Sequence, residues 1–189
     1  MEQNNNATQL EGTVVSRRYN AALDGLQSLG VAIDDGRGNL WVVDYEEQSP
    51  YHVFGGRRVV AFGEAYEPDP LTPHMISSPR GWVGHFRVSS MKLADVTPDA
   101  DVLEIGPRQA LCGRLERHAT WTGKSVLTFV TEGGEGFLVT NDPAGSRGSA
   151  PIEVSAYMVR RSPATSPGPW LWIVCPYSMA DLWKWRRRT

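Results

Sequence analysis

The chain has 189 residues, of which 41% are hydrophobic and 21% charged, and this composition excludes a wholly disordered chain and a fibrous repeat. The 19 glycines and 13 prolines disfavour long helices, because both residue types break them. The net charge of −2 excludes a strongly basic nucleic-acid binder that relies on bulk electrostatics, so any anion-binding role needs a local patch.

Short runs of alternating apolar residues, bounded by Gly, Pro, Asn and Asp, predict β-strands in the first half of the chain. The expected strands are Leu10–Arg18, Gly30–Asp34, Leu40–Tyr45, Arg57–Ala65 and Trp82–Leu93. Between the second and third strands, Asp35–Asn39 (DGRGN) predicts a hairpin turn, because glycine and asparagine tolerate positive φ. Glu46–Gly55 and the proline-rich Pro68–Arg80 are expected to be loops.

The same order of elements recurs in the second half. The expected strands are Ala110–Arg117, Ser125–Thr131, Gly136–Thr140, Pro151–Arg160 and Trp170–Cys175. Glu132–Glu135 is a second glycine-rich hairpin, and Asn141–Ala150 is a loop where the first half has Glu46–Gly55. Ser178 is the expected N-cap of a short C-terminal helix.

This recurrence indicates an internal duplication. Gly12 in the first strand corresponds to Gly113, and Pro68 after the fourth strand corresponds to Pro163. The alternative is a single large β-sandwich, in which strands look alike because half-buried strands share one pattern.

Each half resembles an OB-fold, a five-stranded Greek-key barrel. The similarity lies in a glycine in the first strand (Gly12 or Gly113), a hairpin of strands two and three, and a fourth strand of the form GxxVxxxGxxxxP at Gly56–Pro68. The second half departs from this form, with Tyr157 or a neighbour in place of Gly63. The resemblance implies an all-β protein of two tandem OB-like five-stranded Greek-key barrels with a short C-terminal helix.

The expected domains follow from these strands. They are a flexible N-terminus at 1–9, an OB-like domain at 10–96, a linker at 97–107 and a second OB-like domain with a basic aromatic tail at 108–189. The polar Met1–Glu11 is unlike a signal peptide, and no apolar run has the length of a membrane span, so we expect a cytoplasmic protein. Cys112 and Cys175 are then expected to be buried free thiols.

No motif indicates an enzyme. The four histidines are scattered along the chain without metal-ligand spacing, and no nucleophile elbow, phosphate-binding loop or zinc-protease motif occurs. The paired carboxylates Asp34 and Asp35 fall at a turn, which favours a solvated role. We therefore expect no catalytic residue, metal or cofactor, although a hydrolase with an unrecognised site stays open.

The resemblance implies a ligand-binding face over strands two and three. Single-stranded nucleic acid needs aromatic platforms and cations there. If Leu40 and Val42 point inward, alternation places Trp41 and Tyr45 on the outer face as stacking residues. The cations expected to contact phosphates are Arg17, Arg18, Arg37 and Arg87. The alternative is that Trp41 packs against the second domain or a partner chain.

The last residues of the chain combine indole rings with positive charge. They are Trp183, Lys184, Arg186, Arg187 and Arg188. This pattern predicts a contact site for an acidic surface. The alternative is that Leu182 and Trp185 dock on the barrel while the arginines stay solvated.

The sequence thus favours a non-enzymatic binding protein, with single-stranded nucleic acid as the ligand. The runner-up is a scaffold or accessory subunit of a protein assembly, in which the same aromatic surfaces contact protein. The acidic charge of the chain outside its C-terminal residues favours this runner-up.

Overall fold

The computed structural model of the protein is built almost wholly from β-strands. It describes residues 8–20, 27–45, 49–67, 74–75, 82–119, 123–140, 151–162 and 168–174. All strands belong to one eleven-stranded sheet, which confirms the all-β expectation. In this described part of the chain, no helix has the length and apolar character needed to cross a membrane. The chain divides into two compact units, Met1–Pro107 and Arg108–Thr189.

The first unit contains the expected strands, a short helix and a strand that was not expected. Its elements are β1 (Thr8–Asn20), β2 (Gln27–Asp34), β3 (Asn39–Asp44), the 3-10 helix η1 (Pro50–Phe54), β4 (Arg58–Tyr66), β5 (His74–Met75), β6 (Trp82–Leu93) and the beginning of β7 (Val102–Ala119). The expectation that Pro68–Arg80 is a loop was wrong at His74–Met75, which pair with Asn20 and Tyr19 of β1 as β5. The expectation that all of Glu46–Gly55 is a loop was wrong, because Pro50–Phe54 forms η1. Proline at its first position and Ser49 Oγ, which accepts a hydrogen bond from the Tyr51 backbone N–H at 3.3 Å, start the helix. The buried rings of Tyr51 and Phe54 anchor it.

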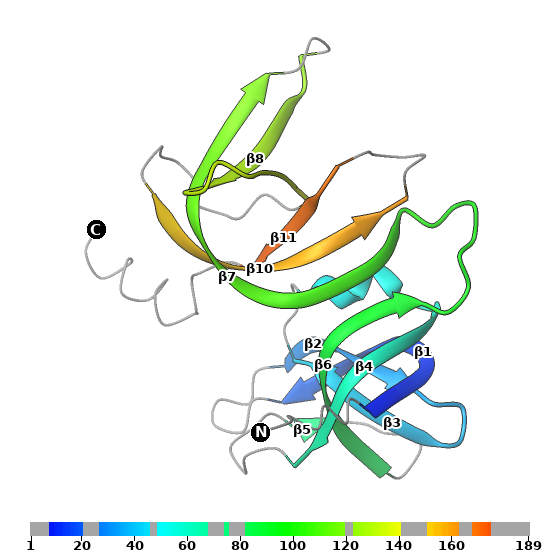
Figure 1. Ribbon diagram of the computed structural model, residues 1–189. Coiled ribbons are helices and arrows are strands. Elements are labelled where there is room, and N and C mark those ends of the chain that lie inside the picture. Colours follow the sequence, from blue (N-terminus) through cyan, green and yellow to red (C-terminus); the bar gives the residue numbers. More distant parts are fainter. Residues whose placement is uncertain are drawn as a thin grey trace, which may run out of the picture. The chain divides into compact units, whose positions relative to one another are not determined.

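Five strands of the first unit pair in a closed order (Figure 1). β1 is antiparallel to β2 and β4, β2 to β3, and β4 to β6, while β3 and β6 are parallel. The DGRGN turn is formed as expected, with Gly36 and Gly38 at φ 74° and 104°. The buried apolar side chains of these strands are Leu10, Val14, Val31, Ala32, Ile33, Leu40, Val42, Val59, Ala61, Phe86, Met91 and Leu93.

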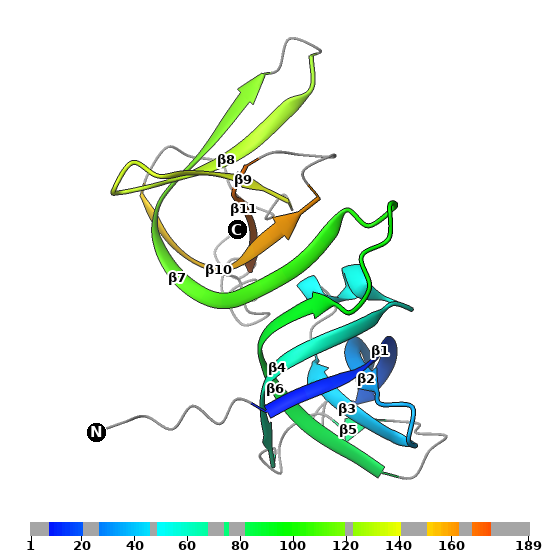
Figure 2. The same cartoon turned by 45° about the vertical axis from the view of Figure 1, so that its right-hand side comes forward.

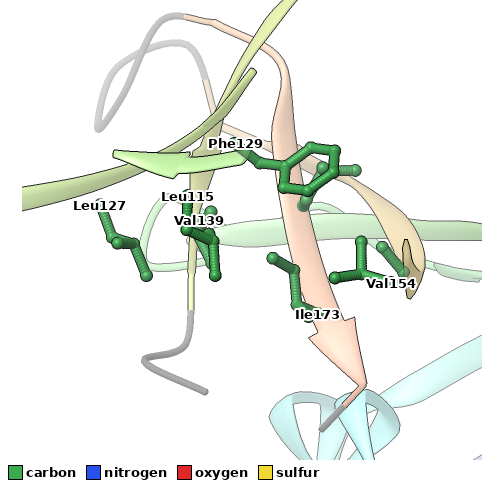
Figure 3. Packing of buried hydrophobic residues seen from close by; sticks show 8 residues of the cluster. Leu115, Leu127, Phe129, Val139, Val154 and Ile173 are labelled. Atoms are coloured by element: carbon green, nitrogen blue, oxygen red, sulfur yellow. The ribbon is translucent and has the colours of Figure 1, made fainter. Parts of the chain in front are cut away.

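The second unit repeats this pairing order. Its strands are β7 from Arg108 onward, β8 (Ser125–Thr131), β9 (Gly136–Val139), β10 (Ile152–Arg161) and β11 (Trp170–Val174). β7 pairs with β8 and β10, β8 with β9, and β10 with β11, while β9 and β11 are parallel. Figure 3 shows core side chains from all five strands gathered in one cluster that includes Phe129.

A glycine in the first strand of each unit permits a close approach of the second strand. A Cβ atom on Gly12 would lie 2.3 Å from the Asp34 carbonyl oxygen, and one on Gly113 would lie 2.2 Å from the Val130 carbonyl oxygen. Any larger residue would push the two strands apart. The two glycines therefore occupy equivalent places in the two pairing orders.

β7 is a long curved strand that belongs to both units (Figure 2). It begins at Val102, inside the segment expected to be a linker, because Ile105 and Glu104 pair with Met91 and Lys92 of β6. Cys112 of β7 is an exposed free thiol, whereas we expected it to be buried. Its neighbour Gly113 is buried, so alternation along the strand turns Cys112 outward. Cys175 and the expected C-terminal helix lie outside the described residues.

Candidate ligand-binding surface of the first unit

A β-bulge in β3 separates the two aromatic residues that alternation had placed together. Val31 pairs with Asp44 and Ala32 with Val42, so Val43 is an extra residue without a counterpart on β2. An extra residue reverses the side to which all following side chains point. Because the bulge lies between Trp41 and Tyr45, these two rings are on opposite faces of the sheet.

Trp41 lies on the core side. It pairs with Ile33 of β2, which is fully buried, and with Gly84 of β6, and paired residues point to the same side. Its ring meets Phe86 edge-on, with centroids 6.3 Å apart and an interplanar angle of 84°. Leu40 and Val42 were expected to point inward in place of Trp41. They alternate with Trp41 and are also buried, so the hairpin of β2 and β3 is covered on both faces. This packing removes the geometrical basis for Trp41 as an outer stacking platform.

Tyr45 instead joins a group of aromatic and charged side chains that we name the Tyr–His–Arg cluster: Tyr45, Tyr66, His85 and Arg87. The Tyr45 hydroxyl hydrogen-bonds to His85 Nε2, and the two rings have centroids 6.0 Å apart. The Tyr66 ring meets His85 edge-on at 5.6 Å, and the Arg87 guanidinium carbon lies 5.0 Å from the Tyr66 ring centroid. Arg87 also forms an ion pair with Glu64.

Strand register brings these residues together from distant parts of the sequence. In the antiparallel pair of β4 and β6, Tyr66 is opposite His85 and Glu64 is opposite Arg87. His85 is also next to Val42 in the parallel pair of β3 and β6, and Tyr45 follows β3. Arg87 and Glu64 have side-chain exposures of 66% and 59%, so this face is open to solvent at these two residues, whereas Val42 on the same face is buried.

Burial shapes the electrostatics of the cluster. It raises the pKa of the Tyr45 hydroxyl well above its usual value of 10.0, and the nearby Tyr66 adds to this shift. Burial also raises the pKa of Tyr66, against the effect of the Arg87 charge, while Asp44 raises it further. Both phenols are therefore neutral hydrogen-bonding groups with apolar rings at physiological pH.

The raised pKa of Tyr45 predicts a loss of stability at alkaline pH. Above about pH 10, the phenol ionises in the unfolded chain before it ionises in the folded one, so the folded state loses free energy relative to the unfolded state as the pH rises. We expect the urea midpoint to fall between about pH 9 and about pH 11, and to fall less in Tyr45→Phe. Equal falls in the two proteins would show that Tyr45 has an ordinary pKa.

The four arginines expected to contact phosphates lie in different places. Arg87 is in the cluster. Arg17 pairs with Gly30 of β2. The next residue of β2, Val31, pairs with Asp44, so Arg17 and Tyr45 lie on the two sides of the same position of β2. Its Nη1 donates to the Ser16 carbonyl oxygen at 3.1 Å.

Arg18 and Arg37 lie apart from the cluster in the strand pattern. Arg18 is exposed on β1 beside Leu29, and Arg37 is exposed in the DGRGN turn. The tail residues Trp183, Lys184, Arg186, Arg187 and Arg188 lie outside the described residues.

Neither Tyr66 nor the pairing of Glu64 with Arg87 was expected from the sequence. The expected fourth strand ended at Ala65, one residue before Tyr66. Extending the alternation of β4 by one residue puts Tyr66 on the side of Glu64, opposite the buried Gly63. The alternation of β4 could therefore have indicated the side to which Tyr66 points. It could not have indicated that β6, with His85 and Arg87, lies beside β4.

Neither metal ligation nor a known relative accounts for this surface. Among the residues that the structure describes, no three His, Cys, Asp or Glu side chains are grouped to hold a metal ion. No protein-family model, curated protein or solved structure matches the chain. The function must therefore be argued from the geometry of the cluster.

Proposed function

We propose that the two units are duplicated OB-like barrels. In both, five strands pair in the order one, two, three, five, four and back to one, with the third and fifth strands parallel. The equivalent glycines Gly12 and Gly113 support the duplication, because both allow the same close contact between the first two strands. This fold commonly binds oligonucleotides and oligosaccharides on the outer side of its strands.

We further propose that the first unit binds single-stranded nucleic acid through the Tyr–His–Arg cluster. The observation that carries this proposal is the contiguous set of rings from Tyr45 through His85 to Tyr66, with the Arg87 guanidinium beside the last ring. Unpaired bases stack on aromatic rings and on guanidinium planes, while guanidinium N–H groups bind phosphate. The surface offers both kinds of contact within one group of side chains.

The charge of the surface predicts a weak dependence of affinity on salt. Arg87 is the cation of the cluster, and Arg17 lies across β2 from Tyr45. A single strand releases counterions in proportion to the phosphates neutralised, with a slope of about −0.7 per phosphate in a plot of log affinity against log salt. We therefore expect a slope between about −0.7 and about −1.4.

Fluorescence anisotropy with labelled oligothymidylate tests the binding site. Tyr66→Ala removes a stacking ring, and we expect the dissociation constant to rise about five- to 150-fold, the range for one base–aromatic contact. Arg87→Ala is expected to weaken binding and to reduce the salt slope by about 0.7.

Arg58→Ala is the matched control. Arg58 is on β4, like Tyr66, and its backbone is paired with β1. Its exposed side chain forms an ion pair with Glu11 at 2.7 Å, so its removal should leave the affinity for the oligonucleotide unchanged. Equal losses from Arg58→Ala and Arg87→Ala would mean that binding depends on diffuse charge. Absence of binding by the wild-type protein at low salt would refute the proposal.

A protein contact is the second candidate function, and the acidic neighbours of the cluster favour it. Glu64 is paired with Arg87, and Asp44 is close enough to Tyr66 to raise its pKa. Both carboxylates would repel a phosphate backbone, whereas a protein surface can pair with them. Affinity capture from lysate with and without nuclease separates the two functions, because a partner protein that is retained after nuclease treatment supports the assembly role.

A further inference from the structure

A second group of rings and arginines lies on the outer face of the second unit. In the antiparallel pair of β10 and β11, Tyr157 is opposite Trp172 and Val159 is opposite Trp170. Leu171 and Ile173, which alternate with the two tryptophans, have exposures of 0% and 1% and belong to the core. The tryptophans therefore face away from the core.

Two arginines stand over rings of this group. The Arg161 guanidinium carbon lies 4.4 Å from the Trp170 ring centroid, and that of Arg108 lies 6.0 Å from the Tyr157 ring centroid. Arg108 Nε also donates to Ser155 Oγ at 2.5 Å. A guanidinium group that stacks on a ring keeps its N–H donors in its own plane, directed along the surface and toward a ligand beside the ring.

This surface is positively charged, in contrast to the chain as a whole. On the side of the tryptophans, β10 carries Arg161 and the acid Glu153, β11 carries no charge, and β7 adds Arg108. The net charge of the whole chain is −2. A local excess of cations beside partly exposed rings is complementary to a polyanion with planar, unstacked groups.

The two surfaces occupy equivalent strands. His85 lies on the fifth strand of the first unit, next to Val42 of the third, and Trp170 lies on the fifth strand of the second unit, next to Leu138 of the third. Each of these rings is contacted by a further ring or by an arginine. The same side of the same strands therefore carries aromatic and guanidinium groups in both units.

We infer that the surface formed by Arg108, Tyr157, Arg161, Trp170 and Trp172 is a second binding site for single-stranded DNA, separate from the Tyr–His–Arg cluster. This inference rests on the proposed function and adds a second site to it. The surface presents ring faces and guanidinium groups, and the Ser155 hydroxyl already accepts from Arg108. None of these groups requires a ribose 2′-hydroxyl, and DNA supplies all that they recognise.

Stoichiometry tests the inference. The full-length protein is titrated calorimetrically with oligothymidylate of about eight nucleotides, a length within the range of one OB-type site. We expect two oligonucleotides per wild-type chain and one per chain in the double variants Trp172→Ala/Arg161→Ala and Tyr66→Ala/Arg87→Ala.

Arg108→Gln/Arg161→Gln keeps every ring and should weaken the second site without affecting the fold, which circular dichroism checks. Arg114→Gln, at an exposed arginine of β7 that pairs with Glu116, is the control and should bind two.

The outcomes separate this inference from the proposed function. One oligonucleotide per wild-type chain, lost only in Tyr66→Ala/Arg87→Ala, overturns the second site and leaves the first. One oligonucleotide per wild-type chain that is lost only in the variants of the second unit overturns the first site and supports the second. Absence of binding refutes both, and a strong preference for oligouridylate over oligothymidylate contradicts the assignment of DNA as the ligand.

Discussion

Replacing Gly63 by alanine is expected to destabilise the first unit by roughly 3 kcal/mol or more, at the upper end of the cost of overpacking. A Cβ atom at this position would lie 1.9 Å from the Arg87 carbonyl oxygen and 3.0 Å from Cε1 of Phe86. The obstacle is backbone, so relief requires β4 and β6 to separate. The shift between Phe62 and Gly63 in the pairing of these strands adds to the local constraint.

The same substitution should damage the binding surface. The carbonyl that the new methyl group would displace belongs to Arg87, whose guanidinium stands over Tyr66. We therefore expect the remaining folded Gly63→Ala protein to bind oligothymidylate more weakly. The measurements are the urea midpoint and the anisotropy titration.

Gly136→Ala is the matched control for this glycine. Gly136 is also a strand residue, but no atom lies within 4 Å of its Cβ position, and its φ is not positive. This change should alter the urea midpoint little or raise it, because alanine reduces the entropy of the unfolded chain. A Gly63→Ala protein as stable as Gly136→Ala would show that β4 and β6 are not in close contact at this position.

Phe129→Ala is expected to cost about 3–5 kcal/mol, the range for deleting a fully buried aromatic ring. Phe129 is 0% exposed and is surrounded by the core of the second unit, including Leu115, Ile173 and the backbone of Gly113. Figure 3 shows its ring extending into the interior from β8. The cavity left behind cannot close fully, because all five strands of the unit border it.

Val126→Ala provides the comparison within the same strand. Val126 is half-buried on β8 and pairs with the exposed His118, so the loss should be about 1 kcal/mol or less. Free energies of unfolding from urea titrations are the measurement. Similar losses in the two variants would contradict the position of Phe129 at the centre of this core.

Local patterns determined the strands of this protein. Trp82–Leu93 and Ser125–Thr131 have the bounds expected from sequence, and the other strand bounds differ mostly by a few residues at an end. The DGRGN hairpin followed from two glycines that adopt positive φ. These features depend on neighbours in sequence, because alternation and turn chemistry act over a few residues.

Two failures of local patterns have one origin in tertiary structure. Alternation placed Trp41 and Tyr45 on one face, but the bulge at Val43 reverses the second half of that stretch. A bulge is specified by how β2 pairs with β3, and no turn or proline in the sequence marks it. The helix η1 was missed because its apolar residues are stabilised by burial in the folded unit.

The sequence by itself determined the all-β character of the chain and the order of its longer strands. Only the tertiary structure decided which outward side chains meet. Tyr45 directly follows β3, Tyr66 ends β4 and His85 lies within β6. Their contacts arise because the parallel pairing of β3 and β6 and the antiparallel pairing of β4 and β6 place them beside one another. Alternation reports the side to which a residue points, whereas register between distant strands decides its neighbours.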